Sequence, residues 1–196
     1  VITSWAGLDN AGAQVAEWID TTIARIRQLA PKRILEIGCG TGQVLTRLAP
    51  QAETYWAADI SEVAIEALQQ NTRLPNVRFL RRGADDFSGI PEAGFDTVIL
   101  NSVAQYFPDA GYLRRVLAGA IRVLQPGGTI FVGDVQGCAL LPVHHAEILR
   151  ARAAADTTCA ELREKVSART ARETELSLDP AWFESLDLPE IVHVQI

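Results

Sequence analysis

Short apolar runs alternate with amphipathic stretches along most of the chain, and this alternation constrains the fold more than any other feature. The runs have the length and content of buried strands, and they lie at residues 33–37, 54–58, 76–80, 95–100 and 129–135. Strands that alternate with helices form a mostly parallel sheet, because right-handed crossovers place helices on both of its faces. The sequence therefore predicts an α/β fold with a mostly parallel central sheet.

The stretches between these runs carry helical patterns. Apolar side chains recur three and four residues apart before the first run, at Val15, Trp18, Ile19, Thr22, Ile23 and Ile26. Further helices are expected at residues 41–48, at 62–70 with Ser61 as the N-cap, and at 112–124 before a Pro-Gly-Gly turn.

The carboxyl-terminal part of the chain is more polar. Residues 146–175 are rich in Arg, Glu and Ala and predict one or two helices with a solvated face; a lid over a ligand pocket is the alternative. A short turn of helix is expected after Asp179, and a last strand at residues 191–196.

Size and charge limit the class of protein. With 196 residues, of which 48% are hydrophobic, residues 1–196 are expected to form one domain. The net charge of −6 disfavours nucleic acid and anionic membranes as partners, and no apolar run approaches the roughly 20 residues that span a bilayer. Three cysteines, far apart and without zinc-ligand spacing, favour a reducing, cytoplasmic location. Because the chain begins with Val1 and contains no methionine, a piece of a larger chain and a free-standing variant both stay open.

A glycine-rich turn, LEIGCGTG, follows the first apolar run. Gly38, Gly40 and Gly42 let a ligand lie against the backbone and the helix N-terminus, which indicates a nucleotide-like ligand. The dinucleotide fingerprint expects its third glycine one position later, where this chain has Gln43. Glu36 would repel a pyrophosphate but attract an ammonium group, so the turn favours a cationic ligand over a dinucleotide.

Acidic residues follow the next two strands. Asp59 lies about 20 residues beyond the turn, where a carboxylate accepts hydrogen bonds from ribose hydroxyls; a helix-capping aspartate is the alternative. Asp85 and Asp86 could accept from an exocyclic adenine amine, with turn-forming acids as the alternative. Asn101 ends the fourth strand and faces the same cleft. The predicted cofactor site also includes Cys39 and Ile60. The small side chain of Cys39 suits the turn.

A glycine turn, a ribose acid, a base-binding acid and an acid for an ammonium group together describe S-adenosylmethionine. The residues resemble the class I S-adenosylmethionine-dependent methyltransferases over nearly the whole chain. The stretches AEWIDTTIARI, PKRILEIGCGTGQVLTRLAP, ADDFSGIPEAGFDTVILNSVAQYFPDAGYL and IFVGDVQG are similar to methyltransferase domains embedded in nonribosomal peptide synthetases. The resemblance implies a Rossmann-like class I methyltransferase fold, S-adenosylmethionine as cofactor, S-adenosylhomocysteine as product, and a role in natural-product biosynthesis.

The chain departs from this family in three places. The segment before the first helix, SWAGLDNAG, is shorter than usual, and Gln136 stands where the family commonly has arginine. An antiparallel strand that normally ends the class I domain is also missing from the pattern.

Candidate acceptor residues lie where the carboxyl edge of the sheet meets the later loops: Asn101, Tyr106, Asp134 and His145. Asp134 ends the fifth strand and is the preferred orienting or proton-accepting carboxylate, with a structural cap as the alternative; His145 matches a histidine of the family. Adjacent helical residues point roughly 100° apart, so His144 and His145 are not expected to share a metal ion. Methyl transfer releases a neutral thioether and needs no metal.

The resemblance implies methylation of the amino nitrogen of an aminoacyl group held by a carrier protein. The partners of an enzyme with this activity would be a peptidyl carrier protein and neighbouring synthetase domains. The alternative is methylation of an oxygen or carbon atom of a free small metabolite.

Overall fold

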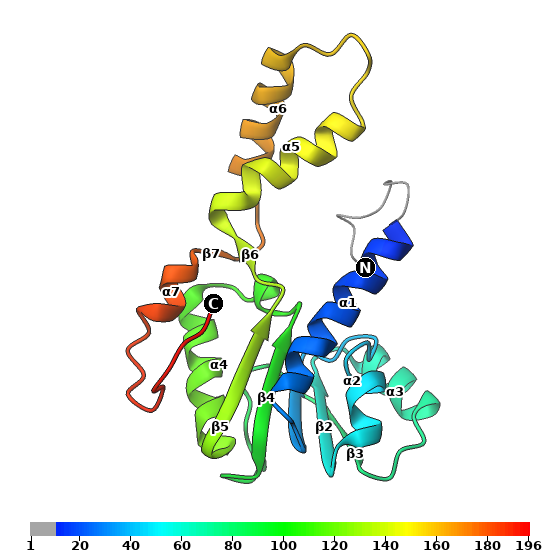
Figure 1. The fold of residues 1–196 in the computed structure, drawn as a ribbon, viewed down its shortest axis with the longest axis vertical. Helices are drawn as coiled ribbons and strands as arrows, with labels where there is room; N and C mark the ends of the chain where they lie inside the picture. The colour runs from blue at the N-terminus through cyan, green and yellow to red at the C-terminus, as the bar shows by residue number, and fades with distance from the viewer. Residues whose placement is uncertain (1–10) are drawn as a thin grey trace.

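A parallel sheet of five strands, in the order β3-β2-β1-β4-β5, forms the centre of the computed structural model, which describes residues 11–196 (Figure 1). The strands are β1 (Arg33–Ile37), β2 (Thr54–Asp59), β3 (Val77–Arg81), β4 (Phe95–Asn101) and β5 (Leu124–Gly133). The strand order reverses between β1 and β4, which pair in parallel. Open α/β sheets bind ligands at the carboxyl ends of the strands beside such a switch. The topology confirms the predicted fold class.

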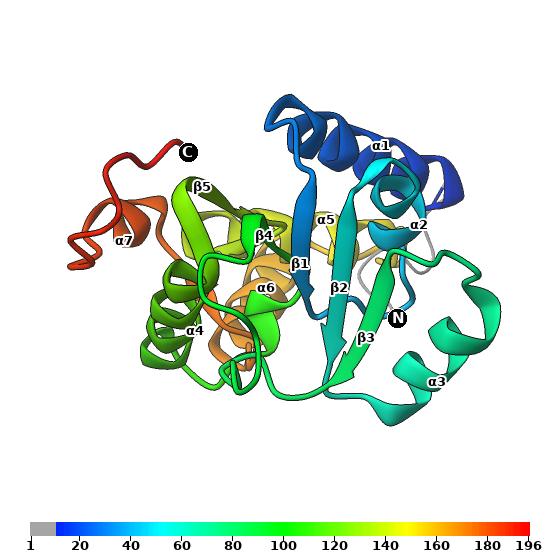
Figure 2. The same ribbon diagram turned by 90° about the horizontal axis from the view of Figure 1, so that it is seen from below.

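Two hydrophobic cores cover the two faces of the sheet. The helices α1 (Ala11–Gln28), α2 (Leu45–Leu48) and α3 (Glu62–Asn71) pack on one face, and α4 (Ala110–Val123) and α7 (Pro180–Glu184) on the other. Figure 2 shows α1 and α4 on opposite sides of the sheet. Strand β4 contributes to both cores, because its side chains alternate between the faces; Val98 belongs to one and Ile99 to the other.

The structure confirms the local sequence patterns that predict the helices. The predicted stripe of the first helix is buried at Ile19, Ile23 and Ile26. The side chain of Ser61 caps α3 by accepting a hydrogen bond from the Ala64 amide, and Asp179 caps α7 in the same way.

Two elements begin or end at residues other than those predicted. Helix α2 begins only at Leu45, because the glycine turn, closed by a Gly42 N–H to Cys39 C=O hydrogen bond, occupies the first positions expected to be helical. Strand β5 begins at Leu124, which pairs with Phe95 ahead of a bulge, and it ends at Gly133. The apolar run alone located the middle of β5 but neither end.

The strand predicted at residues 191–196 is wrong. This segment has no regular secondary structure, and the side chain of Val192 is 96% exposed. An extended apolar segment becomes a strand only when a neighbour satisfies its backbone groups, and none pairs with it within residues 11–196. Most of the SWAGLDNAG segment lies outside the described residues.

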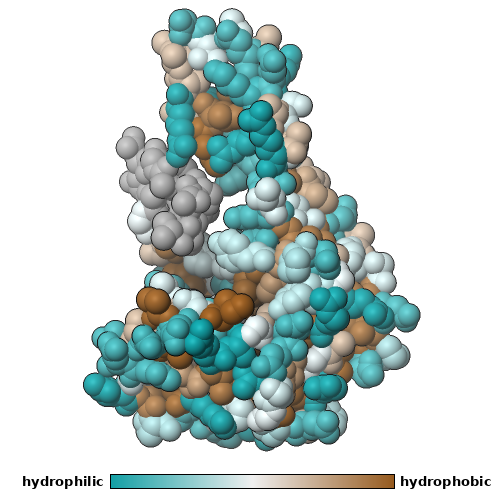
Figure 3. Space-filling view, turned by 180° about the vertical axis from the view of Figure 1, so that it is seen from behind, coloured by the Kyte–Doolittle hydropathy of each residue, from teal (hydrophilic) through white to brown (hydrophobic). Residues whose placement is uncertain are grey.

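A helical hairpin stands beyond the carboxyl ends of the strands (Figure 1). It consists of α5 (Leu141–Ala151) and α6 (Cys159–Ala171), and two short strands, β6 (Gln136–Gly137) and β7 (Ser177–Leu178), pair beneath it. Its surface is mostly hydrophilic, with an apolar patch between the helices (Figure 3). In the part of the chain from residue 11 onward, no helix is long and apolar enough to cross a membrane.

Candidate functional site

The glycine turn leaves open space at one of its three glycines. Gly38, Gly40 and Gly42 have φ angles of 79°, 49° and 79°, a region that favours glycine. A Cβ atom on Gly38 would lie 2.4 Å from Val103, and one on Gly42 would lie 2.6 Å from Leu68. A Cβ atom on Gly40 would meet nothing within 4 Å. Gly38 and Gly42 are therefore required by packing, whereas Gly40 borders space that a ligand could enter.

Glu36 is a buried carboxylate directly before this turn. It is 3% exposed, and its Oε2 accepts a hydrogen bond of 2.7 Å from the Tyr55 hydroxyl. Burial raises the pKa of Glu36 to about 7; the Tyr55 hydrogen bond opposes this shift and the charge of Asp59 adds to it. The sequence predicts that Glu36 attracts an ammonium group, and such a group would favour the charged form of the Glu36 carboxylate.

Asp59 fastens the glycine turn to the start of α3. Its Oδ2 accepts from the Gly40 amide and its Oδ1 from the Ser61 amide, both at 2.8 Å. Ser61, not Asp59, is the N-cap of α3, so the capping alternative does not account for Asp59. The side chain of Ile60 beside it is 75% exposed. A carboxylate has lone pairs beyond those two contacts, and Asp59 is only half-buried, so it can still accept from a ligand hydroxyl.

The two acids after β3 have different environments. Asp86 accepts from the amide and the hydroxyl of Ser88, and these bonds lower its pKa. The turn-forming alternative therefore describes Asp86. Asp85 accepts a 2.8 Å hydrogen bond from the hydroxyl of Tyr112 on α4, which positions its carboxylate beside the sheet edge. Of the two, Asp85 is the better placed to receive an adenine amine.

Cys39 is 4% exposed, and burial, followed by the charges of Glu36 and Asp59, raises the pKa of its thiol. The thiol therefore stays protonated and does not act as a nucleophile. Its place in the turn agrees with the small-residue interpretation.

The ends of β4 and β5 form a polar cluster of Asn101, Ser102 and Asp134. The Ser102 hydroxyl donates to Asp134 Oδ2 at 2.7 Å, and Asn101 Nδ2 donates to Ser102 Oγ at 3.2 Å. Ser102 and Asp134 both have a φ of 55°, an uncommon conformation for residues with side chains that often marks functional sites. Among the described residues, no donor reaches the buried Oδ1 of Asn101. The cluster therefore retains acceptor capacity for a ligand.

In the described part of the chain, the other two predicted acceptor residues make no hydrogen bond to this cluster. Tyr106, in a short 3₁₀ turn after β4, is 65% exposed. His145 is buried in α5, where its Nδ1 lies 3.1 Å from Thr170 Oγ1 and its Nε2 lies 3.2 Å from Glu173. The structure thus ties His145 to the hairpin, and its direct role in catalysis stays a prediction.

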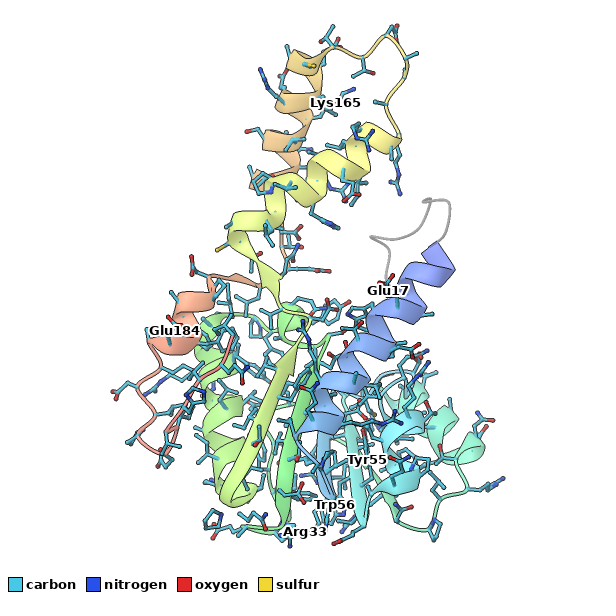
Figure 4. All side chains as sticks on the ribbon, viewed as in Figure 1. Glu17, Arg33, Tyr55, Trp56, Lys165 and Glu184 are labelled. Carbon is cyan, nitrogen blue, oxygen red and sulfur yellow. The ribbon has the colours of Figure 1, made fainter. Side chains whose placement is uncertain are left out.

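A cavity of about 520 Å³ opens beside Asp134, between α1 and β5. It is lined by Trp18 and Phe131, by polar side chains of α1 that include Glu17, and by Gly133 and Asp134. Figure 4 shows Glu17 at the end of α1 that faces the hairpin, whereas Arg33 lies at the opposite edge of the sheet. The cavity can therefore accept a molecule that reaches Asp134.

Residues 34–128 match the methyltransferase domain family. The matched part contains the glycine turn, Asp59, Asp85 and Asn101, which the sequence predicts to bind the cofactor. Residues 34–128 are a methyltransferase domain, and the parallel sheet of order β3-β2-β1-β4-β5 is typical of class I methyltransferases.

Curated relatives of this chain include a chondramide synthase and nonribosomal peptide synthetases. It is 42% identical to "Chondramide synthase cmdD" of Chondromyces crocatus over 99% of this chain and 5% of that protein. It is 32% identical to "Nonribosomal peptide synthetase penN" of Penicillium thymicola over 93% of this chain and 7% of that protein. The likeness thus covers nearly all of this methyltransferase but less than a tenth of either relative.

Solved structures confirm the fold of the methyltransferase. The N-methyltransferase NodS from Bradyrhizobium japonicum WM9 matches with a TM-score of 0.55 at 23% identity, covering 76% of this chain and 82% of that one. The same protein in complex with S-adenosylhomocysteine matches with a TM-score of 0.53 at 20% identity.

The residues of this methyltransferase fit S-adenosylmethionine. The open space at Gly40 admits a ligand against the backbone, and Asn101 Oδ1 has no hydrogen-bond donor among residues 11–196. The carboxylate of Glu36 suits an ammonium group and that of Asp59 suits a ribose diol. The carboxylate of Asp85 suits an adenine amine.

Sequence reasoning missed three residues of the site. Tyr55, Ser102 and Tyr112 each donate a hydrogen bond to a predicted acid from a distant part of the chain. Local patterns do not reveal such pairs, although the spacing of Glu36 and Tyr55 on neighbouring parallel strands could have indicated theirs.

Proposed function

We propose that this methyltransferase N-methylates an aminoacyl group that a carrier protein holds as a thioester. The observation that carries the proposal is the hydrogen-bonded Ser102–Asp134 pair at the mouth of the cavity between α1 and β5. The synthetase relatives support the context. A carrier protein and neighbouring synthetase domains are the partners that this proposal implies.

Glu36, Gly40, Asp59 and Asp85 hold the cofactor in this proposal, with Cys39 and Ile60 beside them. S-adenosylmethionine supplies a methyl group on a positively charged sulfur, and a neutral thioether leaves. Gly40 gives backbone access, Glu36 receives the ammonium group, Asp59 the ribose hydroxyls and Asp85 the adenine amine. Asp86 stays in its turn with Ser88.

Asp134 orients the acceptor and takes its proton. An α-amine has a solution pKa of about 8, so about one tenth of it is neutral near pH 7, and Asp134 takes the proton that the nitrogen loses on methylation. Ser102 fixes the Asp134 carboxylate, and Asn101 fixes Ser102. Alignment of reacting groups at near-contact distance is worth up to about 7–11 kcal/mol of the barrier. In this proposal exposed Tyr106 contacts the acceptor, and His145 acts through the hairpin.

Methyl transfer to matched acceptors tests the proposal. An aminoacyl carrier protein, the same carrier loaded with the 2-hydroxyacyl analogue, and the free amino acid are incubated with S-adenosylmethionine and analysed by mass spectrometry. We expect methylation of the aminoacyl carrier, a loss of at least tenfold in rate in Asp134→Asn, and no change in Asp156→Asn, an exposed acid far along the hairpin. Methylation of the free molecule alone would support the O- or C-methyltransferase alternative instead.

A further inference from the structure

Three chain segments meet at the acceptor end of the sheet. They are the turn after β4, the turn after β5 and the segment that leads into β7. The Leu176 amide donates to the Gln105 carbonyl at 2.8 Å, and Gln136 pairs with Ser177 in the two-stranded β6–β7 sheet. These backbone bonds hold residue 175 beside the Ser102–Asp134 pair.

Glu175 therefore adds a second carboxylate next to Asp134. Loss of hydration and the negative charges of Glu173 and Asp134 raise the pKa of Glu175, and nearby His144 lowers it. Glu173 is already engaged with His145 and with the amides of Thr174 and Glu175. Two neighbouring carboxylates that repel each other are stabilised by a cation that binds between them.

Buried amide oxygens at the same junction lack donors. In the described part of the chain no hydrogen bond reaches Asn101 Oδ1, Gln105 Oε1 or Gln136 Oε1. Asn101 itself is 8% exposed. Because a buried acceptor without a donor is unfavourable, these oxygens favour a ligand that brings N–H groups.

We propose that Glu175 is an acceptor-binding residue, which together with Asp134 binds the acceptor as a primary ammonium ion while the amide oxygens accept from its N–H groups. This inference rests on the proposed function and adds to it the residue that recognises the amine. Glu175 accepts the first proton, from the ammonium nitrogen, which leaves a neutral carboxyl group and a neutral amine with its lone pair. Asp134 takes the second proton, which the nitrogen loses once it is methylated. A hydroxyl acceptor carries no charge and a single donor, so the site discriminates against it.

Binding of two matched probes without any methyl donor tests the inference. The probes are the N-acetylcysteamine thioesters of an L-amino acid and of the corresponding 2-hydroxy acid, titrated by calorimetry. We expect the wild type to bind the aminoacyl probe at least tenfold more tightly than the hydroxyacyl probe. Glu175→Gln should weaken aminoacyl binding about tenfold and hydroxyacyl binding less than twofold.

The controls separate charge from folding. Glu175→Asp retains the carboxylate and should keep aminoacyl binding within about threefold of wild type. Glu164→Gln makes the same charge change on an exposed face of α6 and should have no effect. Equal aminoacyl affinity in Glu175→Gln and Glu164→Gln would overturn the inference. If the wild type still methylates the aminoacyl carrier, only the role of Glu175 fails; absence of that methylation refutes the proposed function itself.

Discussion

Replacing Glu36 by glutamine should change how the stability of the protein depends on pH. Glu36 is buried, and its pKa is raised from 4.5 to about 7, so the folded state holds a proton that the unfolded state releases between these values. Stability therefore falls as pH rises from 4.5 to 7 and is constant above that range. The difference in pKa corresponds to about 3 kcal/mol, because each unit is worth about 1.4 kcal/mol.

Urea unfolding at pH 4.5, 6 and 8, without cofactor, measures this effect. Wild type should lose about 3 kcal/mol more stability between pH 4.5 and 8 than Glu36→Gln, because glutamine does not titrate and can still accept from Tyr55. S-adenosylhomocysteine should bind the wild type more tightly at pH 8 than at pH 5.5, since its ammonium group favours the charged carboxylate. The same pH dependence of unfolding in both proteins would refute the reasoning.

Three further substitutions test separate parts of the site. Gly38→Ala should destabilise the protein by about 1–3 kcal/mol in urea unfolding, since its Cβ would lie 2.4 Å from Val103 and its φ is positive. Ser102→Ala should lower the rate of methyl transfer about tenfold without weakening S-adenosylhomocysteine binding, because it frees the Asp134 side chain; an unchanged rate would contradict the role of the pair. Asp85→Asn should weaken S-adenosylhomocysteine binding about fivefold by calorimetry, and equal affinity would exclude Asp85 from the cofactor site.

The sequence predicts the parts of the fold that depend on local pattern. Strand β1 and the buried stripe of α1 follow directly from apolar spacing, and the side chain of Ser61 marks the start of α3. The sequence pattern predicts the start of β5 several residues too late, because the true start depends on pairing with Phe95 across a bulge. The segment 191–196 was predicted as a strand, although a strand also needs a partner that the pattern cannot supply.

The residues of the candidate site also divide into those that a local sequence pattern predicts and those that it does not. The glycine turn and Asp59 are predictable, because a turn with positive φ angles favours glycine and Asp59 accepts from the amide of Gly40 in that turn. The roles of Ser102 and Glu175 depend on contacts between distant segments, so no local pattern reveals them. His145 has the residue type of a catalytic base, but its position is fixed by packing against α6.

Calorimetric titration of S-adenosylhomocysteine tests the central claim most directly, which is that the glycine turn and Asp59 hold the cofactor. Wild type should bind S-adenosylhomocysteine and give no binding heat with NAD. Asp59→Ala should bind at least tenfold more weakly, whereas Glu66→Ala, an exposed acid on α3, should bind like wild type. Equal affinity in both variants, or binding of NAD in preference to S-adenosylhomocysteine, would contradict the account.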